Sequence, residues 1–388
     1  MDVLVVGAGV AGTTAAIGLA REGLHVMLVD RAKFPRHKVC GCCLNSDAVE
    51  ILDGLGLYSS LRQLGATPIQ QIAIHSSIHS LVIPSKGGVA VSRYTLDGML
   101  HDAAVDAGCR VQDQTTAKIL QIPDTPSKLV AVACSGAGAK EAVIHARTVL
   151  VADGLAGSCM ADIRQAQRAT AQHSLRGYGA HLPVCGHDLP RGEVKMYCGR
   201  GGYVGTVVLE DGSLDIAAAM KPSYIKSSRG PAGAISALIN RSGMKLSGLD
   251  SLQWKATAPL TGCRRQLWMR RVFFLGDSAG YVEPFTGEGM AWAMRSAQAL
   301  QPIVQQAVAG WDDRCGDDWQ RAYRHSIQRS QWRCRFYSYA LRRPSLVTSL
   351  IRLGILLPTP ARQKVAGSLL PPMFQAADQP RSAELAAT

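Results

Sequence analysis

The sequence lacks any uninterrupted apolar run of the roughly 18 to 20 residues that a membrane-spanning helix needs. Because 47% of its 388 residues are nevertheless hydrophobic, we expect a soluble or peripheral protein with a large core, divided into two or three interleaved domains. The first twenty residues resemble a secretory leader in their apolar content, but they lack a basic start and have glycines at Gly7, Gly9 and Gly12. We interpret them as part of the fold and expect a cytoplasmic protein.

The eleven cysteines also lack the even framework that staples small secreted domains. Reduced thiols are therefore expected. Three of them, Cys40, Cys42 and Cys43, crowd into the stretch HKVCGCCLN, which could be a metal site, a disulfide, a loop facing a redox cofactor, or plain packing. A zinc site needs a second pair of ligands, and the other cysteines are solitary, so no metal is predicted. A disulfide within so short a loop is strained, which leaves only a transient one open.

Acidic residues are absent between Asp318 and Asp378, where nine arginines and one lysine occur, and the whole chain carries a net charge of +13. No nucleic-acid-binding module accompanies this charge, so no nucleic-acid partner is predicted. Aromatic residues such as Trp332 and Phe336 alternate with the arginines. This pattern suits a basic helix on an anionic membrane surface or an acidic carrier protein. A solvated helix that packs its aromatics on its own domain is the alternative. The oligomeric state is not indicated.

The N-terminal segment has the pattern of a βαβ unit that binds a dinucleotide. A β-branched run over residues 2–6 leads into Gly7-x-Gly9-x-x-Gly12, and a helical stretch and a second strand ending at Asp30 follow. The first glycine permits the turn, the second lets a pyrophosphate approach, and the third lets helix and strand pack closely. The N-terminus of the helix would face the phosphates, and Asp30 would accept from the adenosine ribose.

The rest of the chain does not continue as alternating strands and helices. Strand-like alternation over 68–92, a helix over 95–107 opened by Thr95, strands over 110–152, a β-rich block over 175–260 and a helix near 288–309 are predicted. This order favours an α/β fold in which a Rossmann-like nucleotide-binding domain is interrupted by a mainly antiparallel β-sheet substrate domain. We assign residues 1–67, 93–165 and 260–310 to the first domain, 68–92 and 166–259 to the second, and 311–388 to a helical, basic C-terminal region.

Two further glycine-acid turns follow predicted parallel strands, at Asp153-Gly154 and Gly276-Asp277. Because the carboxyl ends of such strands line the ligand crevice, both turns should converge on the nucleotide. Pro284, Gly287 and Gly289 stand directly before the next helix, which would bring free N–H groups close to an electron-rich ring system.

In order and spacing, these motifs resemble the FAD enzymes of the geranylgeranyl reductase and p-hydroxybenzoate hydroxylase superfamily, and most closely the geranylgeranyl reductase branch. The resemblance covers about residues 1–310, and Cys42 stands where that branch has the second glycine of a Cys-Gly-Gly turn. The motifs that carry it are the N-terminal glycine turn with Asp30, FPRHKVCG (residues 34–41), Arg93 before YTLD, Asp153-Gly154, and Gly276-Asp277 with EPFTGEG (residues 283–289).

The resemblance implies a Rossmann-like domain of the GR2 type that holds FAD extended, with the flavin ring between the cysteine loop and TGEGM. It also implies reduction by NAD(P)H as a transient donor without a second dinucleotide fold. Arg36 and Lys38 would lower the pKa of a nearby thiol. The cofactor-binding residues are then Gly7, Gly9, Ala11, Gly12, Asp30, Arg31, Arg36, Lys38, Cys40, Gly41, Arg93, Asp153, Gly154, Gly276, Asp277, Pro284, Gly287, Gly289 and Met290.

Two residues are predicted to be catalytic, Cys40 beside the flavin and Tyr203 in the substrate sheet. The Tyr203 strand carries Gly205 and Thr206 where the reductase branch has bulky residues, and small residues there would open a pocket. We predict a hydrophobic small-molecule substrate that is prenyl, polyketide or otherwise lipid-like.

Three functions are open. The first is a reductase that transfers a hydride from the flavin to an alkene while an acid such as Cys40 supplies the proton. The alternative is a monooxygenase that uses a flavin C4a-hydroperoxide to hydroxylate an aromatic or alkyl-phenol ring, with Tyr203 or His181 orienting a hydroxyl. The third is a non-catalytic FAD-binding or electron-transfer module. The sequence favours the reductase.

Overall fold

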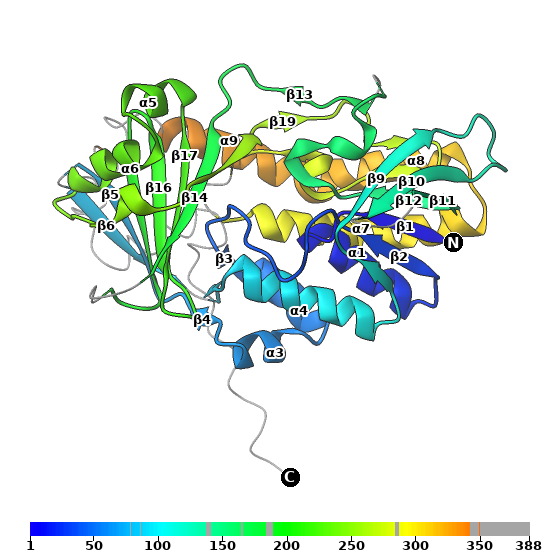
Figure 1. Cartoon of the computed structure of the whole chain (residues 1–388), viewed down its shortest axis with the longest axis horizontal. Helices are drawn as coiled ribbons and strands as arrows, with labels where there is room; N and C mark the ends of the chain where they lie inside the picture. The colour runs from blue at the N-terminus through cyan, green and yellow to red at the C-terminus, as the bar shows by residue number, and fades with distance from the viewer. Residues whose placement is uncertain are drawn as a thin grey trace, which may run out of the picture.

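Two sheets facing each other across the molecule organise the chain. The computed structural model describes residues 1–341 and 349, except 78, 86, 137–140, 164–165, 184–188 and 284–286, and leaves the side chains of 336–341 undescribed. In Figure 1 a seven-stranded sheet stands at one end with α5 (Pro222–Ser227) and α6 (Pro231–Asn240) on its outer side, and a nucleotide-binding sheet lies at the other.

The nucleotide-binding sheet has six strands in the order β20-β21-β12-β1-β2-β8, and all neighbours are parallel except β20 and β21. Its central strands are buried along their whole length and apolar except at Thr148, as expected where helices or sheets cover both faces. The strands are β1 (Val3–Val6), β2 (Val26–Val29), β8 (Arg110–Gln112), β12 (Thr148–Val151), β20 (Trp268–Met269) and β21 (Val272–Phe274).

Three helices pack together against this sheet. The crossover helix α1 (Val10–Arg21) contacts α4 (Arg93–Asp106) on one side and α7 (Gly289–Ala309) on the other. A three-stranded sheet formed by β9 (Thr115–Gln121), β10 (Val130–Gly136) and β11 (Ala142–Ala146) contributes to the same core. Short elements connect these parts: α2 (Ser46–Gly54), α3 (Tyr58–Gln63), η1 (Gly154–Ala156), η2 (Ser158–Met160), η5 (Gly276–Ser278), and the small sheets β3 (Cys43–Leu44), β4 (Thr67–Pro68), β7 (Val89–Ala90) and β13 (Ala169–Thr170), β19 (Gly262–Cys263), β22 (Gly280–Tyr281).

The seven-stranded sheet is assembled from two separated stretches of chain. Its order is β18-β14-β17-β16-β15-β5-β6, antiparallel throughout except for the pair β15 and β5. One face packs on α6 and on η4 (Leu249–Ser251), and the other faces the nucleotide-binding domain. The strands are β5 (Gln71–Ser76), β6 (His79–Pro84), β14 (Arg176–Leu182), β15 (Glu193–Gly199), β16 (Gly202–Val208), β17 (Leu214–Met220) and β18 (Lys255–Pro259).

The described part of the C-terminal region is helical and partly built into the core. It comprises α8 (Asp313–Tyr323), a π-helical turn η6 (Arg324–Gln328) and α9 (Arg329–Leu341). Trp319 and Ile327 are buried in the nucleotide-binding core, whereas the Trp332 side chain is 64% exposed beside Arg335. None of the helices in the described part of the chain has both the length and the apolar character to span a bilayer.

The predicted architecture is confirmed: a Rossmann-like sheet, a mainly antiparallel sheet and a helical C-terminal region are all present. The domain boundaries stay a prediction. One helix start was wrong, because α4 begins at Arg93 and not at Thr95. The side chain of Ser92 accepts from the Thr95 N–H, so Ser92 is the cap and Thr95 already lies in the first turn.

Candidate active site

A cavity of about 610 Å³ lies between the two sheets and is lined from both domains. One end is formed by the turns that follow the parallel strands, and the other by the inner face of the seven-stranded sheet. The cysteine loop lies along it between these ends. Nearly all the predicted site residues line this cavity: Gly7, Gly9, Ala11, Asp30, Arg31, Arg36, Lys38, Cys40, Gly41, Arg93, Asp153, Gly154, Tyr203, Asp277, Gly287, Gly289 and Met290.

The first turn is shaped by three glycines with different surroundings. Gly7 has φ +106°, and a Cβ there would lie 2.3 Å from the carbonyl oxygen of Ala152. A Cβ on Gly12 would lie 1.9 Å from the Gly7 carbonyl oxygen, so Gly12 serves packing behind the cavity. A Cβ on Gly9 would meet only the Arg36 guanidinium, at 3.6 Å. The backbone at Gly9 therefore lies open to the cavity at the N-terminus of α1, as a pyrophosphate requires.

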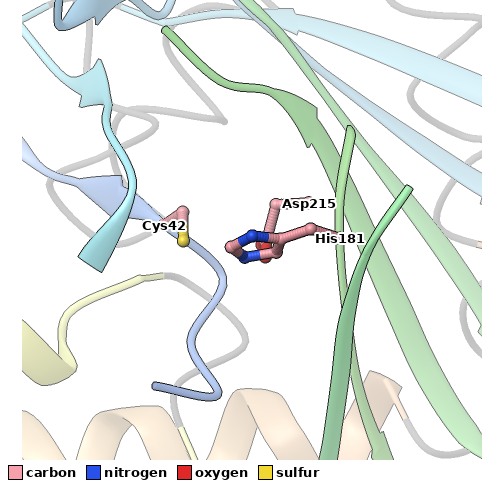
Figure 2. Close-up of side chains that lie close together, drawn as sticks. All are labelled: Cys42, His181 and Asp215. Atoms are coloured by element: carbon pink, nitrogen blue, oxygen red, sulfur yellow. The ribbon is translucent and has the colours of Figure 1, made fainter. Parts of the chain in front are cut away.

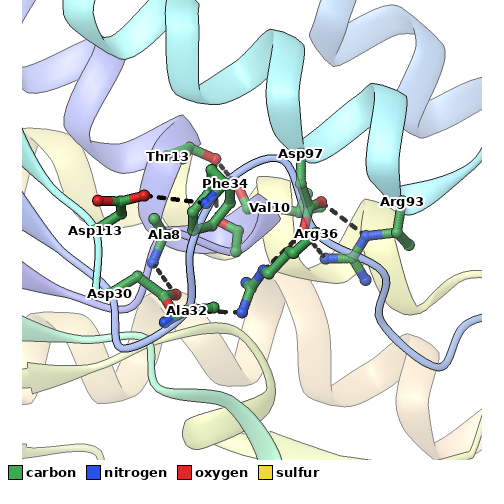
Figure 3. A network of polar contacts seen from close by, with 11 residues as sticks. Ala8, Val10, Thr13, Asp30, Ala32, Phe34, Arg36, Arg93, Asp97 and Asp113 are labelled. Atoms are coloured by element: carbon green, nitrogen blue, oxygen red, sulfur yellow. Dashed lines mark hydrogen bonds and ion pairs between the residues drawn. The ribbon is translucent and has the colours of Figure 1, made fainter. Parts of the chain in front are cut away.

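Asp30 directly follows β2 and fixes the loop that begins there (Figure 3). One carboxylate oxygen accepts from the Ala8 N–H at 2.8 Å and the other from the Ala32 N–H at 2.8 Å, and Arg36 lies 3.4 Å from the latter oxygen. The oxygen bonded to the Ala8 N–H accepts one of these bonds and has a further lone pair. Asp30 can therefore hold the turn and still accept from a ribose hydroxyl.

Arg93 is held rigidly by a buried carboxylate that the sequence analysis did not predict. Its Nε and Nη2 donate to the two oxygens of Asp97 at 2.7 and 2.8 Å, one helical turn further along α4. The Arg36 Nε lies 3.5 Å from the same carboxylate, so two cations share it (Figure 3). Burial and the nearby Arg93 lower the pKa of Lys38, so an anionic group in the cavity would stabilise its charged form.

The other two glycine-acid turns meet the first one. Gly154 and Gly276 have positive φ of +75° and +58°, and a Cβ on Gly276 would lie 2.7 Å from the Ala11 Cβ of α1. Gly276 therefore lies behind the cavity wall, while Asp277 lines it. Asp153 accepts from the Cys159 N–H at 3.0 Å, and burial raises its pKa. Pro284 lies outside the described residues, so its predicted contact with the cofactor stays a prediction.

The cysteine loop brings two thiols into one hydrogen-bonded pair. The Cys42 thiol donates to Cys40, which also lies beside Arg93, and these contacts lower the pKa of Cys40 to about 5 despite its burial. The hydrogen bond to Cys40 and burial raise the pKa of Cys42 well above its usual range. Cys43 donates to the Gly41 carbonyl oxygen at 3.0 Å, and burial raises its pKa too. Near neutral pH the Cys40–Cys42 pair therefore carries one proton.

Behind the pair lies a polar cluster that the sequence analysis did not predict. Cys42, His181 and Asp215 bring a sulfur, a ring nitrogen and a carboxylate oxygen within 4.8 Å of one another (Figure 2). His181 was considered only as a residue that orients a hydroxyl. The sequence feature that could have indicated this cluster is Cys42, which replaces a glycine of the geranylgeranyl reductase branch. In the structure Cys42 keeps a positive φ of 51°.

The substrate end of the cavity is walled by small side chains. Strand register places Gly177 opposite Ala219 and Ala219 opposite Tyr203, with Ala217 opposite Gly205. Ile72, Val194 and Met196 continue this wall on the neighbouring strands. The predicted opening beside Tyr203 is thus a stretch of cavity with apolar walls.

Fold and site together define a flavoprotein oxidoreductase, and comparison with known proteins agrees. A family model described as an FAD binding domain matches residues 1–193. The chain is 27% identical over 342 residues to a menaquinone reductase of Mycobacterium tuberculosis, covering 78% of this chain and 76% of that protein. It is 25% identical over 320 residues to digeranylgeranylglycerophospholipid reductase 2 of Methanothermobacter thermautotrophicus, covering 79% and 78%.

Solved structures share the fold at lower identity. A geranylgeranyl bacteriochlorophyll reductase-like protein of Thermoplasma acidophilum superposes with a TM-score of 0.76 at 17% identity, over 95% of this chain and 96% of that one. A myxobacterial chondrochloren halogenase superposes with a TM-score of 0.74 at 20% identity, over 94% and 92%. The predicted relationship is confirmed at the level of the FAD-dependent oxidoreductases, and the chain is similar to reductases of the geranylgeranyl reductase branch.

Proposed function

We propose that the protein is an NAD(P)H-dependent reductase that saturates an alkene in a hydrophobic, isoprenoid-bearing substrate. The observation that carries this proposal is the position of Cys40. Its thiol lines the same cavity as the glycine turn at one end and the small apolar wall at the other. A proton source therefore lies where a cofactor held by the turn and a substrate held by the wall would meet.

The cavity suits FAD on the nucleotide side. The open backbone at Gly9, the carboxylate of Asp30 and the cations Arg36 and Lys38 match a pyrophosphate and a ribose. Arg93, fixed by Asp97, would hold the cysteine loop in place beside the cofactor. When bound and reduced by NAD(P)H, FAD supplies the hydride that alkene reduction needs.

The protein's own part is to exclude water, orient the alkene and supply the proton. The wall of Gly205, Ala217 and Ala219 leaves room for an alkyl or prenyl chain without a charged partner on those positions. A proton must reach the second alkene carbon as the hydride reaches the first, and Cys40 is the thiol that borders the cavity there. The named activities of the menaquinone and digeranylgeranylglycerophospholipid reductases support this substrate class.

Anaerobic turnover tests the proposal. Purified holoenzyme is mixed with NADPH or NADH and either a short-chain menaquinone or a geranylgeranyl glycerolipid, and the products are analysed by mass spectrometry. We expect a mass gain of two hydrogen atoms per reduced double bond without oxygen. A strict oxygen requirement with a gain of one oxygen atom would identify a monooxygenase and overturn the reductase.

The Cys40→Ser variant tests the proton donor. Because general acids typically contribute about 10²- to 10⁴-fold, we expect kcat to fall at least about 100-fold while FAD binding and flavin reduction by NAD(P)H are retained. Cys263→Ser, at an exposed cysteine, is the matched control. Full activity in Cys40→Ser would leave this thiol no part in the chemistry.

A further inference from the structure

The thiol of Cys42 lies between the Cys40 thiol and the polar pair of His181 and Asp215. Its backbone has φ 51°, and its fully buried side chain points from the cysteine loop toward the inner face of the seven-stranded sheet. The thiol donates to Cys40 on one side, and on the other its sulfur lies within 4.8 Å of the His181 ring nitrogen and the Asp215 carboxylate. Since one S–H proton can serve only one acceptor at a time, Cys42 can pass a proton between them.

Asp215 continues the chain of contacts away from the cavity. It lies on β17 directly opposite His181 on β14, and the His181 Nε2 is 3.1 Å from the Asp215 Oδ1. Figure 2 shows the imidazole and the carboxylate side by side with the Cys42 sulfur facing them. Burial raises the pKa of Asp215 to about 6, and the hydrogen bond to Asp215 raises the pKa of His181, so the pair holds a proton near neutral pH.

His181 connects this cluster to solvent through a second histidine. The ring of His37, an exposed residue of the loop before Cys40, meets the ring of His181 edge-on with centroids 5.0 Å apart. The charged groups that face this histidine pair are Asp211 and Glu210, which act on His181, and Lys255 and Asp211, which act on His37. A partly buried imidazole between a carboxylate and an exposed imidazole is well placed to exchange protons with water.

We propose that Cys42, Asp215 and His181 form a proton relay that reloads Cys40 from solvent, with His37 at the outer end. This inference rests on the proposed function, in which Cys40 protonates the substrate. In each cycle Cys42 first passes its proton to Cys40, and the Cys40 S–H bond breaks as the C–H bond forms on the alkene. Cys42 then takes a proton from the Asp215–His181 pair, and His181 recovers one through His37.

The chemistry of the thiol pair explains why such a relay is needed. The hydrogen bond from Cys42 and the nearby Arg93 lower the pKa of Cys40 and favour its thiolate, so Cys40 can donate only when Cys42 passes its proton across. Donation without resupply would leave two thiolates side by side in a buried loop, which their mutual repulsion opposes. The acid of the reaction is therefore the connected set and not the single thiol.

Steady-state and rapid kinetics of Asp215→Asn and His181→Gln test the relay in the holoenzyme. We expect kcat for alkene reduction to fall about tenfold or more, with unchanged flavin reduction by NAD(P)H and a larger solvent isotope effect. His181→Gln should also abolish the fall of kcat at the pH where His181 loses its proton. His75→Gln is the matched control, a half-buried histidine on β5 that stacks on Tyr197 and does not line the cavity.

The reactivity of Cys40 in the protein without cofactor provides a second readout. Site-resolved mass spectrometry after iodoacetamide labelling at several pH values reports the pKa of Cys40. We expect Cys42→Ala to raise that pKa toward the ordinary thiol value, because the hydrogen bond that lowers it most is lost. An unchanged labelling profile in Cys42→Ala would show that the two thiols are not coupled and would overturn the relay.

The two proposals fail in different ways. If Cys40→Ser keeps full turnover, the Cys40 proton donor is wrong and the relay falls with it. If Cys40→Ser is inactive while Asp215→Asn and His181→Gln turn over with the wild-type kcat and pH profile, only the relay is wrong. Loss of FAD absorbance in a variant would mark a folding defect, and the labelling of Cys42→Ala then decides.

Discussion

At the scale of single residues, the three glycines of the first turn have separate duties. Gly7 and Gly12 are required by the protein itself, because a Cβ at either would overlap the neighbouring backbone. Gly9 has an extended backbone with φ −79° and ψ 179°, which any residue can adopt. Its requirement for glycine therefore comes from what approaches it in the cavity.

Replacement of Gly9 by alanine separates binding from folding. We expect Gly9→Ala to leave the unfolding free energy of the cofactor-free protein within about 0.5 kcal/mol and to weaken FAD binding about tenfold or more, because its Cβ takes space that the pyrophosphate needs. Gly12→Ala should instead destabilise the protein by roughly 1–3 kcal/mol. Flavin fluorescence titration and urea denaturation measure both effects, and Gly54→Ala, with no atom near the added Cβ, is the control. Wild-type FAD affinity in Gly9→Ala would contradict the assignment.

At the scale of elements, the register of the seven-stranded sheet decides what the cavity can hold. The sequence analysis predicted small residues beside Tyr203 from one strand alone. Residues Gly177, Ala219 and Gly205 come from three strands, and only their pairing shows that they form one small-residue wall. A period of two reveals which residues share a face of a strand, but not which strands are neighbours, so the full wall could not be predicted.

Filling this wall should change the substrate without disturbing the cofactor. We expect Ala217→Leu to raise KM for a long isoprenoid substrate about tenfold and to affect a short one less, because the added side chain lies opposite Gly205 in the cavity. FAD binding should be unaffected. Val82→Leu, at an exposed position of β6, is the control. Equal effects on long and short substrates would place the isoprenoid chain elsewhere.

At the scale of the whole molecule, the sequence predicts where local motifs converge but not which residues distant in the chain come into contact. The turns at Gly7, Asp153 and Asp277 each follow a strand, so their convergence at one sheet edge could be predicted from the order of motifs. The cluster of Cys42, His181 and Asp215 combines residues from both domains, and no sequence spacing predicts it. Its only trace was a thiol in place of an expected glycine.

The basic C-terminal region has two parts, one up to residue 341 that the structure describes and one beyond it. Tyr323, Ile327 and Cys334 are buried in the nucleotide-binding core, so the stretch up to α9 belongs to the fold. Trp332 is nevertheless 64% exposed, so packing of the interleaved aromatics on the domain stays a prediction. The arginines at 342, 343 and 352 lie outside the described residues, and contact of this region with a membrane or an acidic carrier stays a proposal.

Charge substitutions in the full chain test that contact. We expect a triple variant with Arg342→Gln, Arg343→Gln and Arg352→Gln to bind vesicles containing anionic lipid about tenfold or more weakly, since each arginine near such a surface contributes about 1 kcal/mol. Wild-type binding should weaken as salt is added. The control variant Arg62→Gln, Arg110→Gln, Arg241→Gln removes the same charge from exposed positions elsewhere. Cosedimentation measures both, and equal losses would mean that the net charge of +13 acts as a whole and that no membrane-binding surface is localised at the C-terminus.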